Sequence, residues 1–355
     1  MGCSVKGIIS ELTERKVNKC TIELCGNASN VYYSGQLISG TVQLILNEKK
    51  KVRDILVKVL GVAYVRWIEP RGRNDNVNKG KEIIFDKKIE LIHDSDGMVT
   101  YSKCLIQSNE HSFVISLDTV QLMPGLYYYP FECKLPHCIP SSLELKYGYI
   151  RYKVQTVLDN LLWSSEEFEK FFTVIGVSEL TPHMLEPVTI HNQKTFNLYC
   201  YLSCIPSDPL ATVAKIPSCG YLPRQTIDLH LHVNNRSTQP VIEFTVQLIQ
   251  KIQYHTHTNS SRKKIDKIVL KQEYREGCKP GEVQEMDVNI VVPTVPPSQN
   301  TYCNIIKIDY FIRIIVSVPW FHSDSELYLP INIGSGPIQD DPTVPAWINP
   351  LANDF

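Results

Sequence analysis

The chain has 355 residues, 43% of them apolar and 21% charged, and its length suggests roughly two globular domains. Its 36 Lys and Arg residues balance 37 Asp and Glu residues, which argues against a protein held on nucleic acid by bulk positive charge. The sequence has no apolar run of about 18 residues and no signal-peptide core, and its 11 cysteines form no tight framework. We therefore expect a cytoplasmic protein whose cysteines are reduced.

Alternating apolar and polar residues predict β-strands from one end of the chain to the other. In residues 55–67 the odd positions are apolar and the even positions are mixed, as a strand with one buried face requires. The same alternation recurs in residues 150–158, 227–233 and 242–248. The best helical pattern, at residues 166–172, is too short to form a stable helix alone. The sequence therefore predicts an all-β protein.

The strand pattern also repeats. A shift of 189 residues aligns 38–44 with 227–233, and a later shift of about 157 aligns 131–136 with 288–293. The difference predicts roughly 30 extra residues in the first copy, between Ile68 and Met123. We expect two tandem, immunoglobulin-like antiparallel β-sandwiches joined by a short linker.

The strand pattern and the prolines set the expected domain boundaries. The first sandwich is predicted at residues 6–176 and the second at 187–335, with a linker at 177–186. Residues 336–355 contain several prolines and no strand pattern, so we interpret them as a tail.

The candidate binding residues are basic side chains at predicted turns and on one strand face. Such side chains attract anionic lipid or phosphorylated peptide. The alternative, that lysines merely keep turns solvated and edge strands apart, stays open. The candidates are Lys49, Lys50, Lys51 and Arg53 at the tip of the first hairpin, Lys146, Arg151 and Lys153 on or beside one strand, and Arg262, Lys263 and Lys264 farther along.

Motifs for catalysis and metal binding are weak. There is no nucleophile elbow, phosphate-binding loop or dinucleotide-binding motif, so we do not expect an enzyme. Two His-x-His pairs, His230/His232 and His255/His257, are typical of metal ligands. A hairpin turn near Ser237 would place the two pairs roughly 37 Å apart, too far for a shared zinc ion. We expect neither a metal nor a cofactor.

Cys278 is the best candidate for a reactive thiol. It lies in a turn-like segment between Arg275 and Lys279, and neighbouring cations lower the pKa of a thiol. A thiolate at this position would react with a redox partner.

Several motifs resemble the arrestin family in the order in which they occur. Residues 35–42 (GQLISGTV), 55–67 (ILVKVLGVAYVRW) and 124–136 (PGLYYYPFECKLP) resemble the amino-terminal arrestin domain. Residues 221–254 and 308–319 are similar to the carboxy-terminal arrestin domain. The resemblance covers residues 6–335, and within the superfamily it is strongest to the α-arrestins.

This resemblance implies a non-catalytic adaptor with two β-sandwiches. Such adaptors recognise the cytosolic tails of membrane proteins and direct their ubiquitination, endocytosis and sorting. They are recruited peripherally to the plasma membrane or endosomes, where anionic lipid is a further partner. Family members contact HECT-type ubiquitin ligases through Pro-Pro-x-Tyr. Here Pro296-Pro297 is followed by Ser298-Gln299, so we expect that contact to be indirect or absent.

Two alternatives remain open. The thioredoxin-interacting branch of the family uses a cysteine in its second domain, and Cys278 lies in a comparable stretch, which implies a redox-regulatory partner of thioredoxin. A metal-dependent enzyme is the third hypothesis.

The opening Met-Gly-Cys resembles an acylation site, although Lys6 stands where the pattern requires Ser or Thr.

Overall fold

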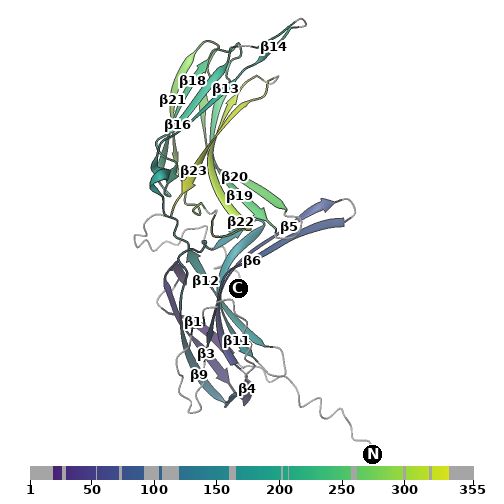
Figure 1. Cartoon of the computed structure of the whole chain (residues 1–355), viewed down its shortest axis with the longest axis vertical. Helices are drawn as coiled ribbons and strands as arrows, with labels where there is room; N and C mark the ends of the chain where they lie inside the picture. Colours follow the sequence, from purple (N-terminus) through teal and green to yellow (C-terminus); the bar gives the residue numbers. More distant parts are fainter. Residues whose placement is uncertain are drawn as a thin grey trace, which may run out of the picture. The chain divides into compact units, whose positions relative to one another are not determined.

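A computed structural model of the chain (Figure 1) describes most of its residues and divides them into two compact units. The first unit comprises Met1–Val62, Ile83–His137 and Arg151–Ile175, and the second comprises Ala63–Glu82, Cys138–Ile150 and Gly176–Phe355. The described residues are 19–25, 29–52, 54–71, 74–91, 104–105, 120–159, 165–200, 203–206, 208–256, 262–298, 301–319 and 322–335.

The first half of the chain forms two main sheets. A three-stranded sheet has the order β1-β3-β9, and a second sheet has the order β2-β12-β11-β5-β6-β7, with β10 paired to β11 and a separate pair formed by β4 and β8. The strands are β1 (Lys19–Leu24), β2 (Val31–Tyr33), β3 (Leu37–Leu46), β4 (Lys50–Val52), β5 (Asp54–Arg71), β6 (Asn74–Glu90), β7 (Cys104–Leu105), β8 (Val120–Leu122), β9 (Gly125–Lys134), β10 (Leu143–Leu145), β11 (Gly148–Asp159) and β12 (Glu166–Ile175).

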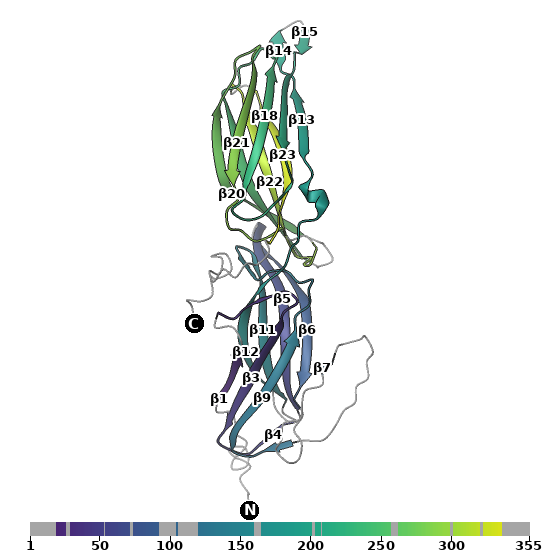
Figure 2. The same ribbon diagram turned by 90° about the vertical axis from the view of Figure 1, so that its left-hand side faces the viewer.

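The second half repeats this arrangement (Figure 2). Its sheets have the orders β13-β16-β18-β21 and β17-β23-β22-β19-β20, and β14 pairs with β15. A short 3-10 helix, η2 (Pro182–Leu185), precedes them. The strands are β13 (Val188–Lys194), β14 (Asn197–Cys200), β15 (Ser203–Pro206), β16 (Leu210–Ile216), β17 (Gly220–Tyr221), β18 (Thr226–Asn235), β19 (Glu243–His255), β20 (Lys263–Glu276), β21 (Val283–Val291), β22 (Ile306–Ser317) and β23 (Ser325–Ile333).

The strand orders confirm the predicted all-β fold of two similar sandwiches. The core order β1-β3-β9 of the first copy matches β16-β18-β21 of the second, and β2-β12-β11-β5-β6 matches β17-β23-β22-β19-β20. The first strand in each of the larger sheets pairs in parallel with its neighbour in both copies. The offset between copies is 189 residues from Leu37 to Thr226 and 158 from Gly148 to Ile306, so the extra segment lies after β6. Within the part of the chain that the structure describes, no helix is long and apolar enough to cross a bilayer.

The alternation of apolar and polar residues in the sequence corresponds to alternating buried and more exposed side chains in the structure. The odd positions of β5 from Ile55 to Trp67 face the core, and so do the even positions of β11 from Ile150 to Leu158. Ile242 is the exception, because it precedes β19 and its side chain is 59% exposed. The short helical pattern at 166–172 lies in strand β12.

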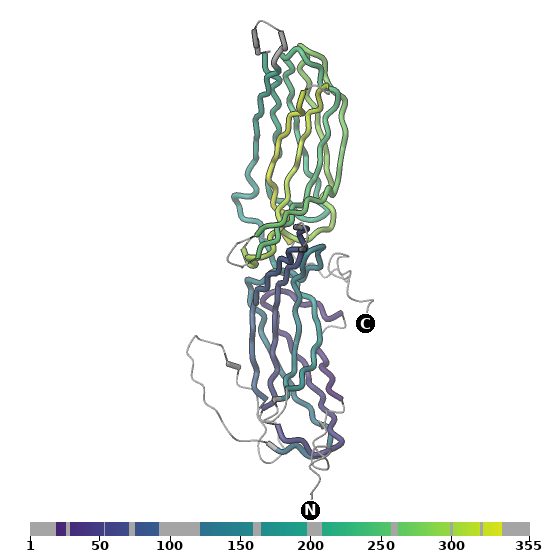
Figure 3. The backbone as a smooth tube through the Cα atoms, turned by 90° about the vertical axis from the view of Figure 1, so that its right-hand side faces the viewer, coloured from purple at the N-terminus to yellow at the C-terminus, as the bar shows by residue number. Residues whose placement is uncertain are grey.

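Two predicted hairpins are wrong. β3 and β5 are consecutive long strands, yet β3 pairs with β1 and β9 in one sheet while β5 lies in the other. In the second copy, β18 pairs with β16 and β21, so the segment near Ser237 connects β18 to β19 without pairing them as a hairpin. In a β-sandwich the chain crosses between sheets at such turns. Figure 3 traces the backbone of the chain from its N-terminus in purple to its C-terminus in yellow.

Candidate functional site

A cluster of cations surrounds Tyr147 in the second unit. The Lys146 ammonium lies 5.2 Å from the centre of the Tyr147 ring, and the Lys264 ammonium lies 4.4 Å from it. Arg262 and Lys263 immediately precede Lys264 in the chain. We call Lys146, Arg262 and Lys264 the basic cluster, because the Lys263 side chain alternates with that of Lys264 and lies on the opposite face of the strand.

The fold fixes the Tyr147 ring from two sides. Lys146 and Tyr147 form the two-residue turn between β10 and β11, where Leu145 pairs with Gly148. The ring packs edge-on against the buried Tyr254, with ring centres 5.5 Å apart. Because Tyr254 pairs with Lys264 across β19 and β20, the same contact places the Lys264 ammonium over the ring. An aromatic face stabilises a nearby cation, so the Tyr147 ring stabilises both ammonium groups.

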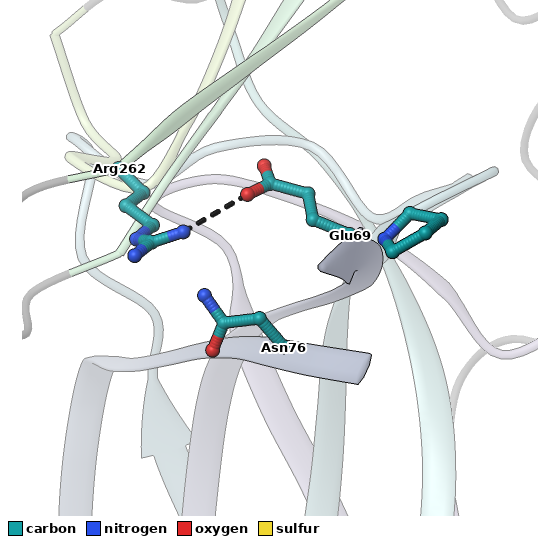
Figure 4. A pocket seen from close by; sticks show the side chains of 4 residues that line it. Glu69, Asn76 and Arg262 are labelled. Atoms are coloured by element: carbon teal, nitrogen blue, oxygen red, sulfur yellow. Dashed lines mark hydrogen bonds and ion pairs between the residues drawn. The ribbon is translucent and has the colours of Figure 1, made fainter. Parts of the chain in front are cut away.

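Arg262 lines a small pocket beside this cluster (Figure 4). The pocket has a volume of about 330 Å³ and is lined by Glu69, Pro70, Asn76 and Arg262. One guanidinium nitrogen of Arg262 lies 3.0 Å from a Glu69 carboxylate oxygen. The Trp67 indole N–H donates to the other oxygen of this carboxylate at 2.8 Å. This hydrogen bond, with support from Arg262, lowers the pKa of Glu69 and keeps the carboxylate charged.

The other predicted basic residues are not part of this cluster. The expectation of an exposed Lys50 at a hairpin tip is wrong, because Lys50 is buried in β4 and pairs with Glu166 of β12. Lys153 of β11 pairs with Glu169, which also lies in β12. Carboxylates of β12 therefore neutralise both lysines. Lys49 and Lys51 are exposed, Arg151 is half-buried on β11, and Arg53 lies outside the described residues.

The histidines of β18 have carboxylate partners on β21. His230 Nδ1 lies 2.7 Å from an oxygen of Asp287, and His232 Nδ1 lies 3.1 Å from an oxygen of Glu285. Within the described ranges, no three His, Cys, Asp or Glu side chains converge on a possible metal position. His257 lies outside those ranges, as do the Met-Gly-Cys start and the predicted tail.

The predicted low pKa of Cys278 is wrong. Its side chain is only 3% exposed, and burial raises the pKa of the thiol despite a hydrogen bond with Asn235. The Arg275 guanidinium is not directed at the sulfur. It donates to the Tyr274 carbonyl oxygen at 2.7 Å and lies 3.7 Å from Glu273. The prediction failed because Arg275 is near Cys278 in the sequence but its guanidinium makes other contacts.

Comparison with known proteins agrees with the duplicated sandwich. Residues 20–181 match the family described as "Arrestin (or S-antigen), N-terminal domain", and residues 206–338 match "Arrestin (or S-antigen), C-terminal domain". The chain therefore belongs to the arrestin family, whose members are adaptors rather than enzymes.

Its relatives define the branch. The chain is 25% identical over 302 residues to arrestin domain-containing protein 17 of Caenorhabditis elegans, covering 82% of this chain and 66% of the relative. It is 23% identical over 318 residues to human arrestin domain-containing protein 1, covering 89% and 64%. It is 24% identical over 317 residues to human thioredoxin-interacting protein, covering 86% and 71%. These relatives place it among the α-arrestins, and it spans about two thirds of the length of the first two.

Proposed function

We propose that this protein is a cytoplasmic, non-catalytic adaptor that binds acidic or phosphorylated cytosolic tails of membrane proteins. It would link these proteins to ubiquitination, endocytosis and sorting at the plasma membrane or endosomes. A HECT-type ubiquitin ligase reached through an intermediate protein, and anionic lipid, are further partners in this proposal.

The basic cluster is the observation that carries the proposal. Lys146 and Lys264 come from distant parts of the sequence and share one aromatic ring, and neither forms an ion pair with a carboxylate of the described residues. Anionic groups bind most strongly where several cations converge in this way. Lys49, Lys51 and Arg151 are further candidates for contact with anionic groups.

Affinity capture from membrane extracts tests the proposal. The full chain should recover membrane proteins that a Lys146→Glu, Lys264→Glu double variant recovers at about a tenth of the amount, because each change replaces attraction by repulsion. Lys215→Glu is a matched control, since Lys215 is exposed on β16 in the other sheet of the same copy. Equal recovery by all three proteins would refute the role of the basic cluster in binding.

A further inference from the structure

Strand β20 leaves one edge of its sheet open. It is the last strand of the order β17-β23-β22-β19-β20, and in the described part of the chain it pairs with β19 alone (Figures 1 and 2). All 14 of its residues are half-buried or exposed. Backbone groups at an open edge can pair with another extended chain.

The hydrogen-bond pattern identifies the residues whose backbone faces this edge. The Thr256 N–H donates to the Arg262 carbonyl oxygen at 3.0 Å, which makes these two residues a hydrogen-bonded pair just before β20. In an antiparallel ladder, bonded and non-bonded pairs alternate. Every second residue after Arg262 therefore bonds to β19, and the residues between them turn their N–H and C=O groups to the open edge. These edge residues are Lys263, Ile265, Lys267 and Val269.

The same four side chains share one face, on which lysines alternate with apolar residues. Ile265 is 47% exposed and Val269 is 48% exposed, and both lysines are exposed. The Lys267 ammonium lies 5.9 Å from the centre of the Phe311 ring. Among the described residues, neither Lys263 nor Lys267 forms an ion pair, although the charge of Lys267 helps to lower the pKa of Glu326 on β23.

Charge indicates what this edge would accept. Residues 262–276 carry six basic and three acidic side chains. A second copy of the chain, paired antiparallel along the same four edge residues, would set each lysine opposite an apolar residue and diagonal to a lysine of the other copy, so the lysines would gain no acidic partner. An extended peptide with acidic residues at alternate positions would instead face a positive edge.

We propose that β20 takes an acidic, extended segment of a partner protein as an added strand. Acidic side chains of this segment lie opposite Lys263 and Lys267, and apolar side chains lie opposite Ile265 and Val269. The inference rests on the proposed adaptor function, for which it names the binding mode. An anionic lipid surface would satisfy the lysines but would offer nothing comparable to the row of backbone groups, so the edge favours a peptide.

A fluorescent peptide of sequence Val-Ser-Glu-Ser-Val-Ser-Glu is a suitable probe, because its Val and Glu residues match the four edge side chains in antiparallel pairing. We expect the full chain to bind it, as measured by fluorescence anisotropy. A Lys263→Glu, Lys267→Glu double variant should bind about tenfold more weakly or worse, since both cross-strand pairs become repulsive. Lys215→Glu, on the other sheet, should bind as the unaltered chain does.

Two methylated peptides separate strand pairing from simple charge attraction. N-methylation of the Glu and internal Val residues removes the N–H groups directed at β20, whereas N-methylation of the Ser residues leaves those donors in place. We expect the first peptide to lose binding and the second to retain it. Equal binding of both peptides overturns strand addition, as does failure of the unmodified peptide to bind.

Vesicles containing phosphatidylserine complete the test. We expect the Lys263→Glu, Lys267→Glu variant to bind these vesicles as the unaltered chain does. Loss of vesicle binding in this variant, with no peptide binding by the unaltered chain, would assign the edge to lipid and overturn the inference. If the peptide fails while capture of membrane proteins still depends on Lys146 and Lys264, this inference is wrong and the adaptor function stands.

Discussion

The two copies of the sandwich differ in the pairing of one equivalent strand. β6 follows β5 in the first copy as β20 follows β19 in the second. β6 gains a further neighbour, β7, where Lys88 pairs with Leu105, whereas β20 pairs only with β19 in the described residues. Residues 91–124 connect β6 to β9, and only residues 277–282 connect β20 to β21. The longer connection supplies a two-residue strand that pairs with Lys88 and Ile89 at the end of β6, and the shorter connection supplies none. The two copies therefore differ in whether the connection after this edge strand contributes a pairing partner.

The largest expected effect tests whether the two copies are independent structures. Ile38 of β3 and Ile227 of β18 are equivalent and fully buried. Ile38→Ala and Ile227→Ala should each lower the free energy of unfolding by about 2–5 kcal/mol, because each leaves a cavity in a packed core. Calorimetry should resolve two unfolding transitions, and each variant should lower the midpoint temperature of a different one. If calorimetry instead shows a single transition whose midpoint temperature both variants lower equally, the two copies unfold as one cooperative unit.

Amide hydrogen exchange would sharpen the comparison at the two edges. We expect the Ile265 and Lys267 amides of β20 to exchange at least about tenfold faster than those of Lys264 and Asp266, since only the latter bond to β19. NMR exchange rates measure this directly. The probe peptide should slow the fast pair and leave the other pair unchanged. Uniform protection along β20 would contradict the open edge.

The short turn after β20 predicts a slow thiol. Because burial raises the pKa of Cys278, its thiolate fraction at pH 8 is smaller than that of an ordinary thiol. We expect iodoacetamide to alkylate Cys278 at least about tenfold more slowly than the exposed Cys25 and Cys138, as followed by peptide mass spectrometry. The difference should disappear in urea. Preferential labelling of Cys278 in the folded chain would revive the redox hypothesis.

The smallest effect concerns the ion pair beside the basic cluster. Glu69 and Arg262 are 40% and 33% exposed, so we expect Glu69→Gln to lower the free energy of unfolding only slightly. The folded-state pKa of Glu69 lies below the ordinary value of 4.5, so its contribution is present above pH 4.5 and is lost as the pH falls through the folded-state pKa. Urea titrations at pH 7 and pH 3 measure the difference. An equal cost at both pH values would contradict this assignment.

The sequence predicted the class of fold because alternation reports which face of a strand is buried. In β5 and β11 that information was sufficient, and the repeat located the extra segment of the first copy. Alternation does not report which strand is the partner, so it assigned β3 and β5 to a hairpin although they lie in different sheets.

The basic cluster was predicted only in part. Lys146 and Lys264 were recognisable as charges, but nothing in the sequence links two residues so far apart. The Tyr147 ring that joins them is preceded by Lys146 and followed by Gly148, a turn pattern that could have drawn attention to it. Lys50 and Cys278 were misjudged because their neighbours in space, not those in sequence, determine burial and charge.

An irregularity in β20 limits the length of regular strand with which the proposed added segment can pair. Leu248 of β19 pairs with Lys271 and Ile249 pairs with Val269, so Leu270 is an extra residue. Such a β-bulge reverses the facing of the side chains beyond it. A regularly alternating ligand can stay in phase only from Lys263 to Val269, a stretch of about 20 Å. The specificity of this adaptor would thus reside in a short linear motif of about seven residues, which unrelated cargo proteins could acquire by few mutations.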